Sequence, residues 1–194
     1  MAEIIVQNLV LGMVATNTYF LMNPETKEML LVDPADEAGA IEQKVSAMGG
    51  TPRAVLLTHG HYDHMLAADE VRKKYGIQVY AHELEEQVLE NPSLNLSGFW
   101  SSPYSMKADC LVKEGDVLRL AGWEIHVMHT PGHTLGSVCY YFPEQKILMS
   151  GDTLFCESYG RTDFPTSSAR DMQNSIKRLL RELPEDTAVY PGHQ

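Results

Sequence analysis

Short apolar runs separated by turns fill the N-terminal part of the chain. Residues 3–7 (EIIVQ), 17–23 (NTYFLMN) and 28–33 (EMLLVD) have the length and the β-branched or aromatic content of strands. Asn23-Pro24, between the second and third runs, is typical of a hairpin turn. The pattern predicts three consecutive strands.

The next stretch alternates helical and strand patterns. Residues 36–48 carry apolar side chains at helical spacing and stop at Gly49-Gly50. A second helical pattern runs from 64 to 75 and is followed by Gly76, a typical helix C-cap. Two strands and a short helix are predicted around it, at 53–58, 77–82 and 83–90.

Beyond residue 90 the periodic patterns first disappear and then return. Residues 91–109 are polar and aromatic without a period, which predicts a long loop that either walls a site or packs on the surface. The order of the elements as a whole predicts helices outside two mostly antiparallel sheets, an α/β or α+β class. The later elements are strands at 117–120, 123–129, 137–142, 146–150 and 187–191, and a helix from 167 or 168 to 183.

Composition narrows the class of protein. The 194 residues suit one domain, and the net charge of −11 without a basic stripe argues against nucleic acid or an anionic membrane as partner. The three cysteines form no C-x-x-C pair, which favours a reducing compartment. The N-terminus has no positively charged leader and no apolar run approaches 18 residues. We expect a cytoplasmic protein.

Metal-ligating residue types follow predicted strands at four places. THGHYDH, residues 58–64, comes directly after an apolar strand, and TPGH, SGD and YPGH follow later ones. Strand ends are free of the hydrogen-bond ladder yet held by it, so these side chains can converge at one sheet edge. Histidine with aspartate suits zinc, with iron or manganese as alternatives. The candidate ligands are His59, His61, Asp63, His64, His133, Asp152 and His193.

These ligands are too many for one tetrahedral ion and suit two divalent ions that share a carboxylate. Such a pair, roughly 3.5–4 Å apart, can activate a water at neutral pH. Two ions bring four positive charges, of which two aspartates and one hydroxide cancel three, so an anionic transition state is favoured. We therefore predict a dinuclear hydrolytic site. The other histidines, His82, His126 and His129, are predicted to be structural.

At these motifs the sequence resembles the metallo-β-lactamase superfamily. THGHYDH matches its H-x-H-x-D-H motif, and TPGHT, SGDTLF and YPGH match its later motifs in order. The resemblance implies a single domain over residues 1–194 with a four-layer αββα sandwich, an α+β fold of two mixed sheets flanked by helices. It also implies one metal on His59, His61 and His133, a second on Asp63, His64 and His193, and Asp152 as the bridge.

Within the superfamily, GDTLF followed by Tyr159-Gly160-Arg161 resembles glyoxalase II (hydroxyacylglutathione hydrolase) and its short bacterial relatives. The likeness implies hydrolysis of S-lactoylglutathione or another small thioester by a metal-bridging hydroxide that Asp63 orients. We expect no C-terminal glutathione-binding helical domain. Arg161 either binds a substrate carboxylate or forms an ordinary ion pair, and Asp33 either supports the ligand loop or caps a turn.

Three other functions stay open. GRTDF, residues 160–164, also resembles persulfide dioxygenases, in which one iron is held by two histidines and a carboxylate. A lactonase and a non-catalytic metal-binding module are further alternatives. The best-known β-lactamases have cysteine in the place of Asp152, which argues against antibiotic hydrolysis.

Overall fold

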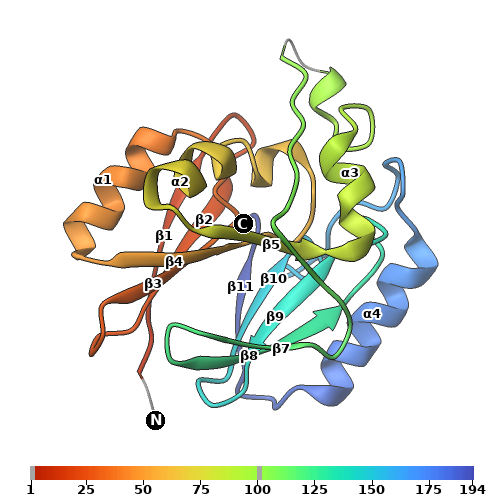
Figure 1. The fold of residues 1–194 in the computed structure, drawn as a ribbon. Helices are drawn as coiled ribbons and strands as arrows, with labels where there is room; N and C mark the ends of the chain where they lie inside the picture. Colours follow the sequence, from red (N-terminus) through yellow and green to blue (C-terminus); the bar gives the residue numbers. More distant parts are fainter. Residues whose placement is uncertain (1–2, 100–101) are drawn as a thin grey trace.

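The computed structural model describes residues 3–99 and 102–194 and consists of two sheets stacked face to face with helices outside them (Figure 1). The first sheet has the order β1-β2-β3-β4-β5-β6 and the second β11-β10-β9-β8-β7. The predicted αββα sandwich is confirmed. The strands are β1 (Ile5–Leu11), β2 (Thr16–Met22), β3 (Glu28–Val32), β4 (Thr51–Leu56), β5 (Gln78–His82), β6 (Cys110–Val112), β7 (Val117–Leu120), β8 (Trp123–His129), β9 (Val138–Phe142), β10 (Ile147–Gly151) and β11 (Ala188–Pro191).

The prediction of mostly antiparallel sheets is wrong for the first sheet. Strands β1 to β3 pair antiparallel, but β3-β4, β4-β5 and β5-β6 pair parallel. The helical segments between these later strands act as crossovers, which parallel pairing requires. In the second sheet only β10-β11 is parallel, and β7 to β10 form an antiparallel meander.

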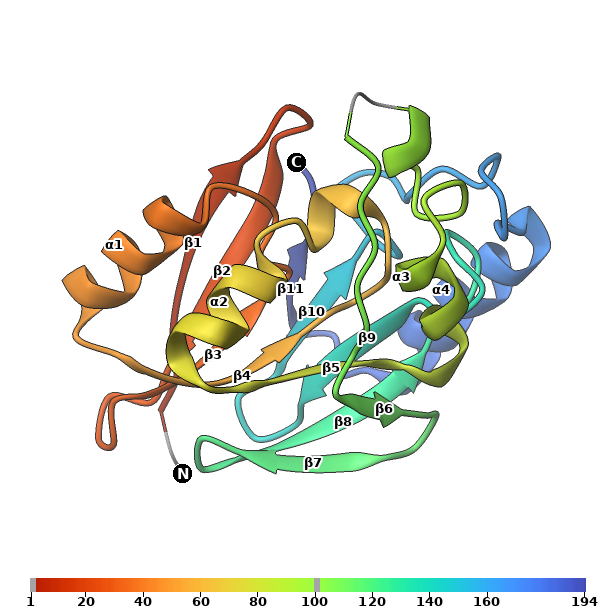
Figure 2. The same cartoon turned by 45° about the horizontal axis from the view of Figure 1, so that its top comes forward.

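The helices cover the outer faces of the two sheets. Figures 1 and 2 show α1 and α2 on the outside of the first sheet and α4 on the opposite side of the molecule. Helix α4 begins at a Ser168 cap, whose Oγ accepts from the Asp171 N–H at 3.2 Å. The helices are α1 (Ala38–Met48), α2 (Ala68–Tyr75), α3 (Glu86–Glu90) and α4 (Ala169–Glu182), with short 3₁₀ turns at Tyr62–His64, Glu83–Glu85 and Ser97–Phe99.

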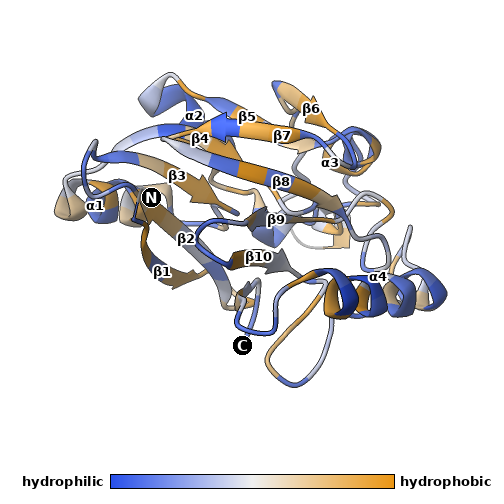
Figure 3. Cartoon of the chain, turned by 90° about the horizontal axis from the view of Figure 1, so that it is seen from below, coloured by the Kyte–Doolittle hydropathy of each residue, from blue (hydrophilic) through white to orange (hydrophobic). Residues whose placement is uncertain are grey.

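Both faces of the central strands are buried. In β2 every residue is buried; Phe20 packs in the core under α1 and α2, whereas Leu21 packs in the core between the sheets. Side chains alternate across a strand, so one strand can contribute to both layers. A third, smaller core joins Leu148 of β10 to Leu179 of α4. Figure 3 shows the result: hydrophobic colouring concentrates on the strands, and α4 is mostly hydrophilic on its outer side.

Several elements differ from the predicted pattern. Strand β1 extends to Leu11 instead of ending at residue 7, and the helix predicted for 83–90 is a 3₁₀ turn followed by α3. The helix predicted for 64–75 is a 3₁₀ turn at Tyr62–His64 followed by α2, because the ligand loop continues past His64. The short strand β6 was not predicted, since three residues carry no readable period. The predicted loop 91–109 contains one 3₁₀ turn; its residues 100–101 lie outside the described residues.

Within the described part of the chain, none of the helices has the length and apolar character needed to cross a bilayer.

Candidate metal centre

The seven candidate ligands all lie just beyond the ends of strands. His59 to His64 occupy the loop and 3₁₀ turn after β4, and His133 lies in the turn between β8 and β9. Asp152 directly follows β10, and His193 follows β11. Strand ends from both sheets thereby bring residues that are distant in sequence into one group.

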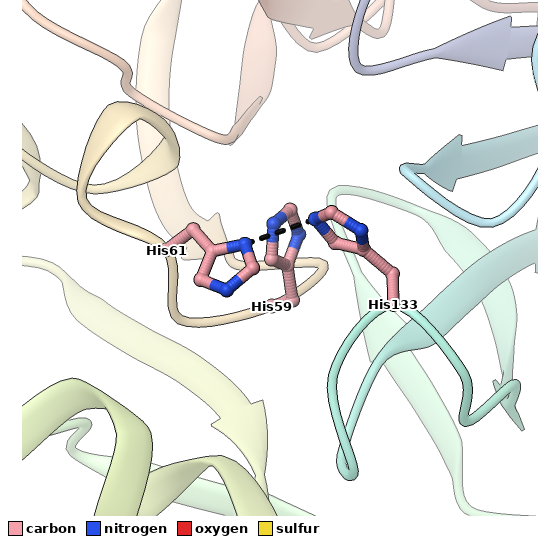
Figure 4. A group of neighbouring side chains, drawn as sticks. All are labelled: His59, His61 and His133. Atoms are coloured by element: carbon pink, nitrogen blue, oxygen red, sulfur yellow. Dashed lines mark hydrogen bonds between the residues drawn. The ribbon is translucent and has the colours of Figure 1, made fainter. Parts of the chain in front are cut away.

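The first cluster consists of three buried histidines, His59, His61 and His133. Their ligand atoms lie within 4.8 Å of one another, and His61 Nδ1 is 2.9 Å from His133 Nε2. Figure 4 shows the three rings converging from two separate loops. This is the set predicted for the first metal, and it contains no charged carboxylate.

The second cluster consists of Asp63, His64 and His193. His64 is fully buried, whereas the side chains of Asp63 and His193 are 15% and 21% exposed. His64 Nε2 lies 3.5 Å from Asp63 Oδ2 and 3.2 Å from His193 Nε2. This is the set predicted for the second metal, and it is more open to solvent than the first.

Asp152 lies between the two clusters. Its Oδ2 is 3.3 Å from His133 Nε2 in the first cluster, and its Oδ1 is 3.4 Å from His64 Nε2 in the second. His59, His64 and Asp152 also form a group whose ligand atoms lie within 4.8 Å of one another. The position agrees with the bridging role that the motif implies.

The donor atoms of these clusters fit bound cations. Two buried atoms in the clusters, His59 Nε2 and Asp152 Oδ1, have no hydrogen-bond partner among the described residues. A buried polar atom without a partner is costly, and a metal ion would satisfy it. Neutral imidazole nitrogens with carboxylate oxygens are ligands for zinc, iron or manganese. The seven residues therefore remain our proposed ligands, with the identity of the metal open.

Burial and charge distinguish the two clusters electrostatically. Burial lowers the pKa of His59 and of His61 well below the usual value, so both rings are neutral and ready to bind a cation. Burial acts in the same direction on His64, but Asp63, Asp152 and Asp33 outweigh it and raise the pKa of His64 to about 10. Without a metal, the second cluster therefore holds a proton that the first does not.

Neighbouring groups fix which ring nitrogen faces each cluster. His133 Nδ1 is 2.8 Å from the Arg161 carbonyl, an acceptor, so Nδ1 carries the proton and Nε2 is free to bind. His64 Nδ1 donates in the same way to Asp33 Oδ2 at 2.9 Å. Asp33 also accepts from the Thr58 N–H and hydroxyl, at 2.8 and 2.7 Å. Of the two roles considered for Asp33, the contacts favour support of the ligand loop.

Several supporting residues carry no sequence signal. The Thr16 hydroxyl donates to Asp63 Oδ2 at 2.8 Å, and the Ser167 hydroxyl donates to the His133 carbonyl at 2.6 Å. Glu85 accepts hydrogen bonds from both loops of the first cluster. Ordinary serine, threonine and glutamate residues at these positions could be found only from the fold.

A cavity of about 670 Å³ opens over the clusters. Its floor includes ligand residues from both clusters, and its walls are apolar and aromatic. Leu96 and Phe99 come from the predicted loop 91–109, which favours the wall over the plain surface loop. The apolar wall residues are Val14, Leu96, Phe99, Phe155, Tyr159, Phe164 and Pro165.

Arg161 lies at this cavity, but its guanidinium is engaged. It forms two hydrogen bonds with Asp163, at 2.9 and 2.7 Å, and stacks 4.4 Å from the centroid of the Phe164 ring. The Arg161 and Asp163 side chains are 67% and 64% exposed, so the pair is open to exchange with a ligand. Both predicted roles of Arg161, ion pair and carboxylate binder, remain compatible with this geometry.

The histidines predicted to be structural lie outside the clusters. His82 and His129 stack at 4.3 Å, and burial together with His129 lowers the pKa of His82 to about 4. His126 Nε2 lies 3.0 Å from Glu124 on the surface. Among the described residues, neither arrangement belongs to a group of three or more side chains that could hold a metal ion.

The fold and the order of the motifs agree with a known family, whose model, described as the metallo-β-lactamase superfamily, matches residues 11–193. The chain belongs to the metallo-β-lactamase superfamily. Among curated superfamily relatives, the probable metallo-hydrolase YqgX of Bacillus subtilis is 39% identical over 94% of this chain and 86% of its own. The hydroxyacylglutathione hydrolase GloC of Haemophilus influenzae is 29% identical over 87% of this chain and 81% of its own.

Solved structures that resemble this chain support the same family. BLEG-1, titled a B3 metallo-β-lactamase, is 38% identical with a TM-score of 0.93, covering 98% of this chain and 92% of that one. TTHA1623, solved in a di-iron-bound form, is 34% identical with a TM-score of 0.85. The match covers 97% of this chain and 92% of that one. The protein is therefore a metal-dependent hydrolase of this superfamily, and its particular substrate is a separate question.

Proposed function

We propose that the protein is a thioester hydrolase of the hydroxyacylglutathione hydrolase type. The observation that carries this proposal is the position of Asp152, between two histidine-rich clusters on the floor of an apolar-walled cavity. Similarity to the Haemophilus influenzae hydroxyacylglutathione hydrolase supports the substrate class. A small thioester, including a glutathione conjugate, is the proposed substrate.

Two divalent ions bound at the clusters would supply Lewis acidity and an activated water at neutral pH. His59, His61 and His133 would hold one ion, and Asp63, His64 and His193 the other, with Asp152 shared. Asp63 is our candidate catalytic residue. Burial opposes its ionisation, but His64, His193 and Thr16 keep the pKa of Asp63 below its usual value. Its carboxylate would therefore accept a hydrogen bond from the attacking water and orient it.

The cavity walls would bind the uncharged parts of the substrate. Phe99, Tyr159 and Val14 are 73%, 52% and 47% exposed, so they can bury apolar groups of a ligand without first moving aside. Arg161 is the proposed contact for a substrate carboxylate, which would have to displace Asp163 from the guanidinium.

The test combines metal analysis with a substrate panel. Purified protein is assayed for metal content and for hydrolysis of S-lactoylglutathione, an uncharged acyl thioester, a lactone and a β-lactam. We expect two metal ions per chain and turnover of a thioester ahead of the other classes. Thioester hydrolysis that persists without metal, or that survives Asp152→Ala, would refute the proposal.

One observation favours a second candidate, an iron-dependent persulfide dioxygenase. His59, His64 and Asp152 form a group of two histidines and one carboxylate, the ligand set of many non-haem iron oxygenases. One iron per chain with oxygen consumption on a persulfide would support this activity over hydrolysis. Two zinc ions per chain and no oxygen uptake would exclude it.

A further inference from the structure

Glu85 is a fully buried glutamate that belongs to neither ligand cluster. It lies in the 3₁₀ turn Glu83–Glu85, between β5 and α3, and its relative exposure is 0%. Its neighbours Glu83 and Glu86 are exposed on the surface. A carboxylate is taken fully out of water only where donors replace the lost hydration, so the partners of Glu85 indicate its role.

The two carboxylate oxygens of Glu85 bind two different loops. Oε2 accepts from the Gly60 N–H at 2.6 Å, and Gly60 lies between His59 and His61. Oε1 accepts from the Gly136 N–H at 2.8 Å and the Thr134 hydroxyl at 2.7 Å. Thr134 directly follows His133. One side chain therefore joins both loops that supply the first cluster.

Space at the contact is filled on both sides. A Cβ added at Gly60 would lie 2.9 Å from Glu85 Oε2, and one added at Gly136 would lie 2.8 Å from Glu85 Oε1. Real Cβ atoms do not approach that closely, so any larger residue at either position would push the carboxylate away. The two loops can thus meet on Glu85 only because each has glycine at the contact point.

We infer that Glu85 is a positioning residue for the first metal: it sets the spacing between the His59–His61 loop and the His133 loop. The cluster needs three nitrogens at fixed separations, and they come from segments more than 70 residues apart in sequence (His61 and His133 are separated by 72). The strands hold the bases of the loops, and Glu85 ties the loops themselves together. An isosteric amide cannot replace it, because one of its two ends would be a donor facing an N–H donor.

The experiment measures metal affinity one site at a time. His193→Ala removes a ligand of the second cluster and leaves the first, and His61→Ala does the reverse. Glu85→Gln is made in each background, and Zn²⁺ affinity is determined by competition with a chromophoric chelator. Glu86→Gln, an exposed neighbour, is the matched control.

We expect Glu85→Gln to weaken Zn²⁺ binding about 10–100-fold in the His193→Ala background, the usual effect of losing an outer partner of a metal ligand. In the His61→Ala background the change stays within about 2-fold, as for independent sites. Equal losses in both backgrounds would indicate general destabilisation and overturn the inference, as would unchanged affinity in the first. Because the readout is Zn²⁺ affinity, failure of the proposed thioesterase activity leaves this test intact.

A milder pair of variants keeps the inference testable if Glu85→Gln does not fold. Thr134→Val deletes the hydroxyl that donates to Glu85 and also lies 2.7 Å from Ser137 Oγ, without changing side-chain shape, and Thr134→Ser keeps the hydroxyl. In the His193→Ala background, Thr134→Val should weaken Zn²⁺ binding by about 10-fold, the lower end of the value of one hydrogen bond to a charged group, and Thr134→Ser should restore it. Equal Zn²⁺ affinities for the two variants would contradict the positioning role of Glu85.

Discussion

The two ligand clusters lie side by side, yet they are built differently. The first contains three buried, neutral histidines whose loops are joined by Glu85. The second is partly open, contains a carboxylate, and is supported by Asp33 and Thr16. The difference indicates that the two halves of the proposed dinuclear site are not equivalent: one consists of buried, neutral imidazoles, and the other is charged and more exposed, although residues of both reach the floor of the cavity.

The largest effect is expected where the clusters meet. Asp152→Ala should lower thioester hydrolysis by more than about 100-fold, beyond the loss usual for outer partners, because both clusters lose a ligand at once. Steady-state kinetics with metal analysis of the same sample would check this. An active variant that retains two ions would show that Asp152 does not join the clusters.

Removal of metal should separate the clusters in order of exposure. Under increasing chelator, the ion at Asp63, His64 and His193 should leave before the ion at the buried cluster. Each ion present at 100 times its dissociation constant stabilises the fold by about 2.7 kcal/mol, so thermal unfolding should shift in two steps. A single step, with both ions lost together, would contradict the proposed difference in accessibility between the two clusters.

The clusters should also respond differently to pH. In the metal-free protein the pKa of His64 is raised to about 10, so its protonated form stabilises the fold fully below pH 6.5 and loses this effect as pH rises toward 10. A cation at the second cluster must displace that proton, so its affinity should rise about tenfold per pH unit between these values.

His59 and His61 are already neutral because their pKa is lowered, so affinity of the first cluster should stay level above pH 6.5. Chelator competition at pH 7, 8 and 9 in the His193→Ala and His61→Ala backgrounds tests both statements. If the metal affinities of the two clusters changed with pH in the same way, the proposed difference in their protonation would be wrong.

Thr16 offers a more selective change in the second cluster. Thr16→Val removes the hydroxyl that donates to Asp63 and should weaken the second metal by about 10-fold, with the first unaffected. Thr16→Ser retains the donor and is the control. An effect of Thr16→Val on the first cluster would show that the two are coupled.

The smallest effect is expected at the mouth of the cavity. Asp163→Asn should free Arg161 and lower KM for S-lactoylglutathione by no more than a few-fold, because exposed ion pairs contribute little. KM for an uncharged thioester serves as the control and should not change. Equal shifts for both substrates would exclude Arg161 as a carboxylate contact.

The sequence predicted which residues cluster better than it predicted what supports them. Histidine and aspartate directly after apolar strands are unusual enough to be noticed, and the structure brings all seven together. Glu85 lies in the run ELEE and is indistinguishable there from Glu83 and Glu86. Its role depends on two loops from distant strands, which only the assembled fold defines.

Strand direction in the first sheet was missed although a signal for it was present. The predicted helices at 36–48 and 64–75 separate the predicted strands at 28–33, 53–58 and 77–82, and such helical crossovers are what parallel pairing requires. The second sheet was easier, because short turns between β7, β8, β9 and β10 leave antiparallel pairing as the natural choice.

The contacts that hold the loop of His193 join sequence positions near opposite ends of the described chain. Asn17 donates through its side chain to the Pro191 carbonyl at 3.0 Å, and through its N–H to the Gly192 carbonyl at 2.8 Å. Tyr19 adds a hydrogen bond to the same Pro191 carbonyl at 2.7 Å. Contacts between such distant positions carry a larger loop-closure entropy than local contacts. The first cluster takes its ligands from residues 59–133, whereas the second depends on both of these distant segments, so occupancy of the second metal would report that the N-terminal strands and the loop of His193 have docked.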